Sequence, residues 1–195
     1  PDLYVSVPVD GSHLFLNDGQ GRFVDASTAV VGPGGPASDV CVGDVDNDGD
    51  LDIFQASGNV WLEGHRSLLL LNQGNGQFAD GTTAARLPDS LQALTARMAD
   101  FDNDGDLDVL TTMQDHLYLN DGSGTFTEAA TYLGFPAGCF ITALADPDRD
   151  GFVDVSFGSI WGTWDFGGFR RNQGNANHWL EVEAVGVQSN RNGVG

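Results

Sequence analysis

Aspartate recurs at alternate positions in three short segments of this chain, with one exception in the third segment, where Phe152 takes the seventh position. The segment DVDNDGDLD spans residues 44–52, DFDNDGDLD spans residues 100–108 and DPDRDGFVD spans residues 146–154. Carboxylates held about 4–5 Å apart in one turn repel each other by several kcal/mol in total at an effective dielectric near 20. A hard divalent cation among them removes this repulsion. Ligands that are all oxygen select calcium or magnesium over zinc or copper, and six or seven of them in a flexible loop favour calcium.

Each segment is therefore predicted to wrap one calcium ion, with Gly49 and its equivalents allowing the sharp turn. The first, third, fifth and ninth residues supply side-chain oxygens, and the seventh supplies its backbone carbonyl. Phe152 fits this assignment, because the side chain of a backbone ligand is free to vary. The carboxylates of Asp50 and Asp106 are then expected beside the site, and the fourth residue of each loop, such as Asn47, is expected to point outward. The predicted ligands are Asp44, Asp46, Asp48, Asp50 (backbone) and Asp52; Asp100, Asp102, Asp104, Asp106 (backbone) and Asp108; and Asp146, Asp148, Asp150, Phe152 (backbone) and Asp154.

An EF-hand and a solvated turn are the two alternatives for the acidic segments. An EF-hand loop carries Glu at its twelfth position and lies between two helices. The twelfth positions here hold Gln55, Thr111 and Phe157, inside strand-like stretches, which argues against an EF-hand. Solvated acidic turns are the other alternative. One loop alone would leave that alternative open, whereas three loops in phase with a repeat favour metal binding.

The acidic segments belong to a repeat of about fifty residues. A turn motif follows the same rhythm: LNDGQGRF at 16–23, LNQGNGQF at 71–78 and LNDGSGTF at 119–126, with a degenerate copy, RRNQGNAN, at 170–177. The N-terminal stretch PDLYVSV matches the strands that leave the acidic segments. Asp2 is therefore predicted to be the last ligand of an incomplete fourth loop, and the chain is expected to begin inside a repeat.

The repeat predicts an all-β fold made of β-propeller blades. Residues 91–130 read as four short strands, and no stretch of ten or more residues shows a sustained helical stripe. Four-stranded units at this period are typical of propeller blades. We expect about three and a half blades, at residues 1–30, 31–85, 86–132 and 133–174, as part of a larger ring. A β-sandwich or an open solenoid is the structural alternative.

The period, the DxDxDGxxD loops and the LxLNxGxGxF hairpins resemble FG-GAP/VCBS-type repeats, as in the integrin-α-like propeller. The resemblance covers residues 2 to about 174 and implies structural calcium at the edge of each blade. Residues 175–195 depart from it and contain WLEVEAV followed by SNRNGVG. That stretch is similar to the start of an ASPIC/UnbV domain, which follows such propellers in cartilage acidic protein-like secreted proteins.

Composition limits the classes of partner and site. With 28 acidic against 8 basic residues, the chain has a formal net charge of −20, so nucleic acid and anionic membrane surfaces are poor partners. The longest apolar run, Leu68 to Leu71, is too short to insert into a bilayer. Two cysteines, Cys41 and Cys139, exclude a disulfide-dense scaffold and a CxxC zinc site. They either bond each other or remain as buried thiols.

No catalytic motif is present, so a non-catalytic role is expected. His13 and His116 precede LFLN and LYLN at equivalent repeat positions, which marks them as structural. His65 lies in an insertion that either lines a surface pocket or forms a solvated loop. A possible ligand surface consists of Trp61, Trp161 and Trp164, whose rings would stack on sugars or, alternatively, cover the core between blades.

Three function classes remain open on the sequence. The first is a calcium-stabilised extracellular structural or adhesion module of a fibre or matrix, with a protein or glycan partner and possible self-association. The second is a carbohydrate-binding lectin. The third is the non-catalytic propeller domain of a secreted polysaccharide-degrading enzyme. Extracellular calcium loops bind at about 10⁻⁴–10⁻³ M, a range that extracellular calcium fills, so secretion or surface display is expected.

Overall fold

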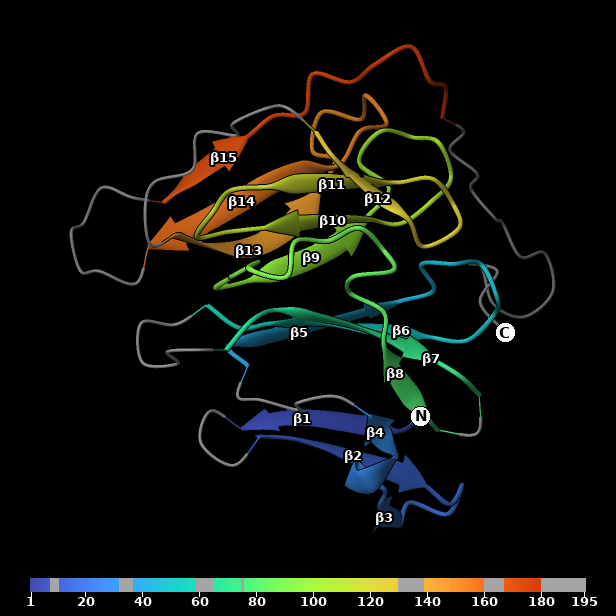
Figure 1. Cartoon of the computed structure of the whole chain (residues 1–195). Helices are drawn as coiled ribbons and strands as arrows, with labels where there is room; N and C mark the ends of the chain where they lie inside the picture. The colour runs from blue at the N-terminus through green and yellow to red at the C-terminus, as the bar shows by residue number, and fades with distance from the viewer. Residues whose placement is uncertain are drawn as a thin grey trace, which may run out of the picture.

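A computed structural model describes residues 1–7, 11–31, 37–58, 65–74, 76–129, 139–159 and 167–179. These residues form short β-strands and one 3-10 turn, η1 (Ser27–Ala29), so the all-β prediction is confirmed. The strands make four sheets that lie one beside the next in chain order (Figure 1). No helix within these ranges is long and apolar enough to cross a membrane.

Each sheet is an antiparallel meander whose strands follow chain order. One pairing departs from this rule: β4, which follows the first sheet in the chain, pairs in parallel with β8 at the outer edge of the second sheet. The first sheet contains β1 (Leu3–Val7), β2 (Gly11–Asn17) and β3 (Phe23–Asp25), and the second contains β4 (Val30–Val31), β5 (Asp39–Gly43), β6 (Asp52–Ala56), β7 (Leu68–Asn72) and β8 (Phe78–Asp80).

The third sheet is the four-stranded unit that the sequence predicts for residues 91–130. The fourth sheet has three strands among the described residues, as does the first. The fold is therefore a row of β-propeller blades. The third sheet contains β9 (Ala96–Ala99), β10 (Asp108–Thr111), β11 (Leu117–Asn120) and β12 (Phe126–Glu128), and the fourth contains β13 (Cys139–Ala145), β14 (Asp154–Ser159) and β15 (Gly168–Arg170).

Strand register places all three acidic segments at equivalent points. Each segment connects the first long strand of its unit to the next, antiparallel strand. The ninth residue of the loop always pairs with the residue immediately before its first aspartate: Gly43 with Asp52, Ala99 with Asp108, and Ala145 with Asp154. The same closing pair therefore fixes the geometry of three separate loops.

Apolar cores fill the spaces between neighbouring sheets. Side chains alternate between the two faces of a strand, so Ile53 and Leu70 pack toward the first sheet whereas Phe54 and Leu69 pack toward the third. Both faces of the second sheet are thus buried, which explains why β7 reads as a continuous apolar run. A third core lies between the third and fourth sheets and includes Phe101, Leu110, Ile141, Val155 and Phe157.

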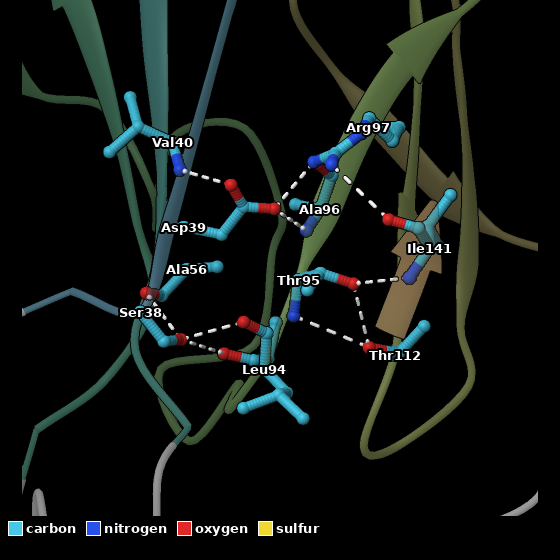
Figure 2. Close-up of polar contacts among 11 residues, drawn as sticks. Ser38, Asp39, Val40, Ala56, Leu94, Thr95, Ala96, Arg97, Thr112 and Ile141 are labelled. Carbon is cyan, nitrogen blue, oxygen red and sulfur yellow. Dashed lines mark hydrogen bonds and ion pairs between the residues drawn. The ribbon is translucent and has the colours of Figure 1, made fainter. Parts of the chain in front are cut away.

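Polar contacts link β5, β9 and β13, the strands that lead into the acidic loops of three successive sheets (Figure 2). The Asp39 carboxylate on β5 accepts hydrogen bonds from the Ala96 backbone N–H, at 3.2 Å, and from the Arg97 guanidinium on β9. Arg97 also donates to the carbonyl of Ile141 on β13, at 3.2 Å, and the Ile141 N–H donates to Thr95 Oγ1, at 3.0 Å. One ion pair and two hydrogen bonds therefore connect three consecutive blades.

The two cysteines are free thiols. Cys41 lies on β5 of the second sheet and Cys139 on β13 of the fourth sheet. Burial raises the pKa of the Cys41 thiol to about 12 and that of the Cys139 thiol to about 11. Both side chains therefore act as small apolar groups in the packing between sheets.

Candidate metal centres

The backbone of the first acidic loop curls around its own carboxylates. Asp44 Oδ1 accepts a hydrogen bond from the Asp48 N–H at 3.2 Å, and Asp44 Oδ2 accepts one from the Gly49 N–H at 3.0 Å. The turn requires left-handed backbone at two residues, with φ of 59° at Asn47 and 94° at Gly49. Asparagine and glycine are the residue types that adopt this conformation at least cost.

The second and third loops repeat these bonds. Asp100 accepts from the N–H groups of Asp104 and Gly105, at 3.1 and 3.0 Å. Asp146 accepts from the N–H groups of Asp150 and Gly151, at 3.2 and 2.9 Å. The fourth and sixth residues are left-handed in both loops, including Arg149 with φ of 58°, where the third loop departs from asparagine.

The ninth residue of each loop is a fully buried anchor. Asp108, which is 0% exposed, accepts a hydrogen bond from the Phe101 N–H at 2.8 Å and one from the Asn120 N–H at 2.9 Å. The Asn120 N–H belongs to the turn motif of the same unit. Asp2 accepts the equivalent bond from the Asn17 N–H, at 2.8 Å, so it matches the anchor aspartates in this contact. The other anchors are Asp52, bonded by Val45 and Asn72, and Asp154, bonded by Asn172.

Three groups of carboxylates lie close enough to hold a metal ion. In each group, one oxygen from every member lies within 4.8 Å of the others. The predicted side-chain ligands Asp52, Asp104 and Asp150 lie outside these groups, and Asp104 and Asp150 each accept a hydrogen bond from the N–H two residues later. The groups are Asp44, Asp46 and Asp48; Asp100, Asp102 and Asp108; and Asp146, Asp148 and Asp154.

Burial makes the charged form of these carboxylates costly. The pKa of Asp108 is raised to about 7, mainly by burial and also by the neighbouring charges of Asp102 and Asp104, while two backbone hydrogen bonds oppose the rise. Burial also raises the pKa of Asp46 and Asp154. One buried oxygen of each, Asp46 Oδ1 and Asp154 Oδ2, has no hydrogen-bond partner among the described residues. A bound cation would satisfy these oxygens and lower the cost of the charge.

The fourth and seventh positions contact the neighbouring turn instead of solvent alone. Asn47 Nδ2 donates to Asp106 Oδ1 at 2.9 Å and to the Gly122 carbonyl at 3.1 Å, both in the next unit. Asn47 is exposed and lies outside the carboxylate groups, as expected for an outward-pointing residue, but its bonds to the next blade were not predicted. The seventh residue is exposed at Asp50, whereas Phe152 is only 8% exposed and packs against the turn at 174.

The asparagines of the turn motif hold the acidic loops in place through their side chains, a role that the sequence analysis did not predict. Asn120 Nδ2 donates to the carbonyl of Val45, in the loop of the preceding unit, at 2.7 Å. Asn172 Nδ2 makes the equivalent bond to the carbonyl of Phe101, at 2.7 Å. The invariant asparagine in the turn motif was the available signal. The first and second loops are thus held both by their own anchor and by the next blade.

Asn120→Ala is expected to destabilise the protein by about 2 kcal/mol more than Asn72→Ala, because it leaves a buried carbonyl without a donor. Asn72 is the matched control: it makes the same local bonds to Leu51 and Gly74, at 3.1 and 3.0 Å, as Asn120 makes to its own loop and turn. Thermal melts of the two variants should differ by about 4–8 °C. Equal melting temperatures would show that the bond to Val45 contributes nothing.

Among the described residues, no further group of metal-ligating side chains accompanies the three acidic loops. His13 and His116 lie in similar settings, each beside the aromatic ring two residues later, as expected for structural repeat positions. The predicted ligand surface of Trp61, Trp161 and Trp164 lies outside the described residues. His65 is half-buried next to Arg66, which pairs with Asp80 and Asp89.

Comparison with known proteins gives three similarities. A family model for the FG-GAP-like repeat matches residues 1–54 and 60–111. Cartilage acidic protein 1 of Mus musculus is 31% identical over 208 residues, which covers 93% of this chain and 30% of the mouse protein. A solved lectin from Agrocybe aegerita, which recognises non-reducing terminal N-acetylglucosamine, is 22% identical, with a TM-score of 0.49 over 75% of this chain and 40% of the lectin.

The family match covers more than half of the chain and includes the first two complete acidic loops. It ends before residue 175, so the ASPIC/UnbV start stays a prediction, and residues 180–195 lie outside the described ranges. The chain spans less than a third of the mouse relative. Four sheets in chain order, three loops with one shared geometry and this match lead to one conclusion: the chain belongs to the FG-GAP-like repeat family.

Proposed function

We propose that this chain is a calcium-binding, non-catalytic β-propeller module with a structural or adhesive role outside the cell. The observation that carries the proposal is the recurrence of one constellation in three units. Each unit has a buried anchor aspartate, a loop curled over its first aspartate, and three carboxylate oxygens within 4.8 Å. A protein surface that needed only solubility would not bury these charges.

Calcium is the cation that fits these donors best. All three groups consist of aspartate, so every side-chain donor is a hard oxygen. Zinc and copper prefer nitrogen or sulfur ligands, and magnesium demands a compact octahedron. Calcium accepts six to eight oxygens in a flexible arrangement. The predicted carbonyl ligands at positions 50, 106 and 152 would complete such a shell.

The ion would act as a structural cross-link. The first and second loops are bonded to the next blade through Asn120 and Asn172, and Asn103 of the second loop donates to the Gly151 carbonyl of the third at 2.8 Å. A cation that fixes the loop therefore also fixes the donors and acceptors at the junction between blades. These cross-links between blades support the role of a rigid scaffold that presents a binding surface, and they do not suggest a catalytic site.

An extracellular location follows from the affinity expected of such loops. Loops of this type in extracellular modules bind at about 10⁻⁴–10⁻³ M, which submicromolar cytosolic calcium leaves empty. The mouse relative is named for cartilage and for acidity, and this chain carries a net charge of −20. A protein or glycan partner in a matrix or on a cell surface is consistent with both.

The test is a calorimetric calcium titration at pH 8 and at pH 5.5. We expect binding at pH 8 and an affinity at the second loop that is at least about tenfold weaker at pH 5.5, because protons then compete for Asp108, whose pKa is raised to about 7. Without calcium, lowering the pH should increase the stability of the folded state. The folded protein binds this proton more tightly than the unfolded chain, so its stability should rise as pH falls through 7. Absence of calcium binding at pH 8 would contradict the proposal.

A further inference from the structure

We propose that the third loop binds its cation more weakly than the first two, because Arg171 already occupies two of its carboxylates. The inference rests on the proposed calcium binding and concerns what sets the affinity of one site. Arg171 Nη2 lies 2.6 Å from Asp148 Oδ2 and 3.1 Å from Asp150 Oδ2. Asp148 belongs to the third carboxylate group, so a cation and the guanidinium would compete for it.

Arg171 is a departure from the repeat. The three complete copies of the turn motif place Leu16, Leu71 and Leu119 immediately before the asparagine, and the fourth copy places Arg171 there. Leu16 and Leu71 pack against apolar cores. The arginine side chain is instead 56% exposed and reaches the loop carboxylates. It supplies a positive charge at a position where the other units supply an apolar group.

The first two loops have no comparable ion pair within the described parts of the chain. Arg66 pairs with Asp80 and Asp89, and Arg97 pairs with Asp39, all outside the acidic loops. The formal charge also differs. Residues 44–52 and 100–108 each contain five aspartates and no basic residue, whereas residues 146–154 contain four aspartates and Arg149. Since ligand charge tunes the calcium affinity of a loop, the third loop should be the weakest.

The third loop nevertheless keeps the geometry of a cation site. Asp154 is 0% exposed, and its Oδ2 has no hydrogen-bond partner among the described residues. An oxygen of Asp154 lies in the group with Asp146 and Asp148, within 4.8 Å of one oxygen of each. Arg171 does not satisfy Asp154 Oδ2. A cation that entered would bind Asp154 and would displace the exposed guanidinium from Asp148.

The segment that carries Arg171 also supplies an optical reporter. Residues 171–179, here called the exit segment, leave β15 and cross the loops of two units: Asn175 and Asn177 donate to the Asp102 carbonyl at 2.7 and 2.8 Å. The indole ring of Trp179 lies directly against Gly151, where any side chain would collide with it. A lanthanide ion in the third loop would therefore receive excitation energy from Trp179.

Terbium titration with excitation of tryptophan tests the inference, because terbium is a hard cation that takes calcium sites. The emission step that disappears in Asp146→Asn reports the third loop. A partly exposed ion pair is worth up to about 1 kcal/mol, which corresponds to about fivefold in affinity. We expect Arg171→Gln to lower the half-saturating terbium concentration of this step about fivefold. Arg22→Gln, an equal charge change on the first sheet, should shift it less than twofold.

A calorimetric calcium titration of the unmodified chain provides a second measurement that needs no variant. It should resolve tighter binding at two sites and weaker binding at one, and Arg171→Gln should bring the weaker site closer to the others. Equal affinity at all three sites, or an unchanged third step in Arg171→Gln, would overturn the inference while leaving calcium binding intact. Absence of any cation binding by either method would instead overturn the proposed function.

Discussion

Removal of calcium is expected to lower the melting temperature of this protein by about 10 °C. A site filled at tenfold over its dissociation constant stabilises the folded state by about 1.4 kcal/mol, so three sites contribute about 4 kcal/mol. For a chain of 195 residues, each kcal/mol corresponds to about 2–4 °C. Three ions would also change the formal charge from −20 to about −14, which relieves repulsion among the loops. Thermal melts in millimolar calcium and in excess EDTA measure this difference.

The chelation experiment needs a control for effects of EDTA itself. Adding calcium beyond the chelator should restore the original melting temperature, whereas the same excess of magnesium should restore little of it. An unchanged melt after exhaustive chelation would show that no structural ion stabilises the fold. That outcome would also remove the reason for placing the protein outside the cell.

Asp108→Ala is expected to destabilise the protein by about 3–5 kcal/mol, even in EDTA. The substitution leaves the N–H groups of Phe101 and Asn120 without their acceptor, and each unsatisfied buried donor costs about 1–3 kcal/mol. In calcium the loss of stability should be larger, because Asp108 is also one of the three carboxylates that lie together in the second loop. Urea unfolding with and without calcium separates the two contributions.

Asp50→Ala is the matched control for this substitution. Asp50 is exposed, and its predicted role as a ligand uses the backbone carbonyl, which alanine keeps. The unfolding free energy of the Asp50→Ala variant in calcium should therefore stay within about 0.5 kcal/mol of that of the unmodified protein. A loss as large as that of Asp108→Ala would mean that the seventh side chain ligates the ion directly, contrary to the assignment made here.

Local features of this protein followed from the sequence because they depend on neighbours in the chain. Alternating aspartates around Gly49 predict a curled loop, and the structure forms that loop with hydrogen bonds from residues four and five positions later. The apolar stretch that follows the loop predicts a strand, and β6 begins at Asp52, the last residue of the loop. Repetition of these local patterns also gave the number of sheets. Backbone geometry and hydrogen bonding over a few residues suffice for each of these features.

Contacts between units were decided by tertiary structure alone. The bond from Asn120 to Val45 joins residues that are 75 positions apart, and the chain from Asp39 through Arg97 to Ile141 joins three blades. The exposed side chain of Asn47, the fourth residue of the first loop, also reaches Asp106 in the next blade, a contact that the sequence did not predict. Such contacts depend on the distance between neighbouring sheets, and the sequence of one repeat does not predict that distance.

The sequence by itself therefore determined what each repeat is: an antiparallel unit with an oxygen-lined loop, because spacing and residue type fix local geometry and ligand chemistry. The tertiary structure decided which contacts each repeat makes with the rest of the chain. It brought Arg171 onto the carboxylates of the third loop and Trp179 onto Gly151, and it kept Cys41 and Cys139 apart on different sheets. Electrostatic competition and burial act through space, so they depend on distances that only the packed sheets establish.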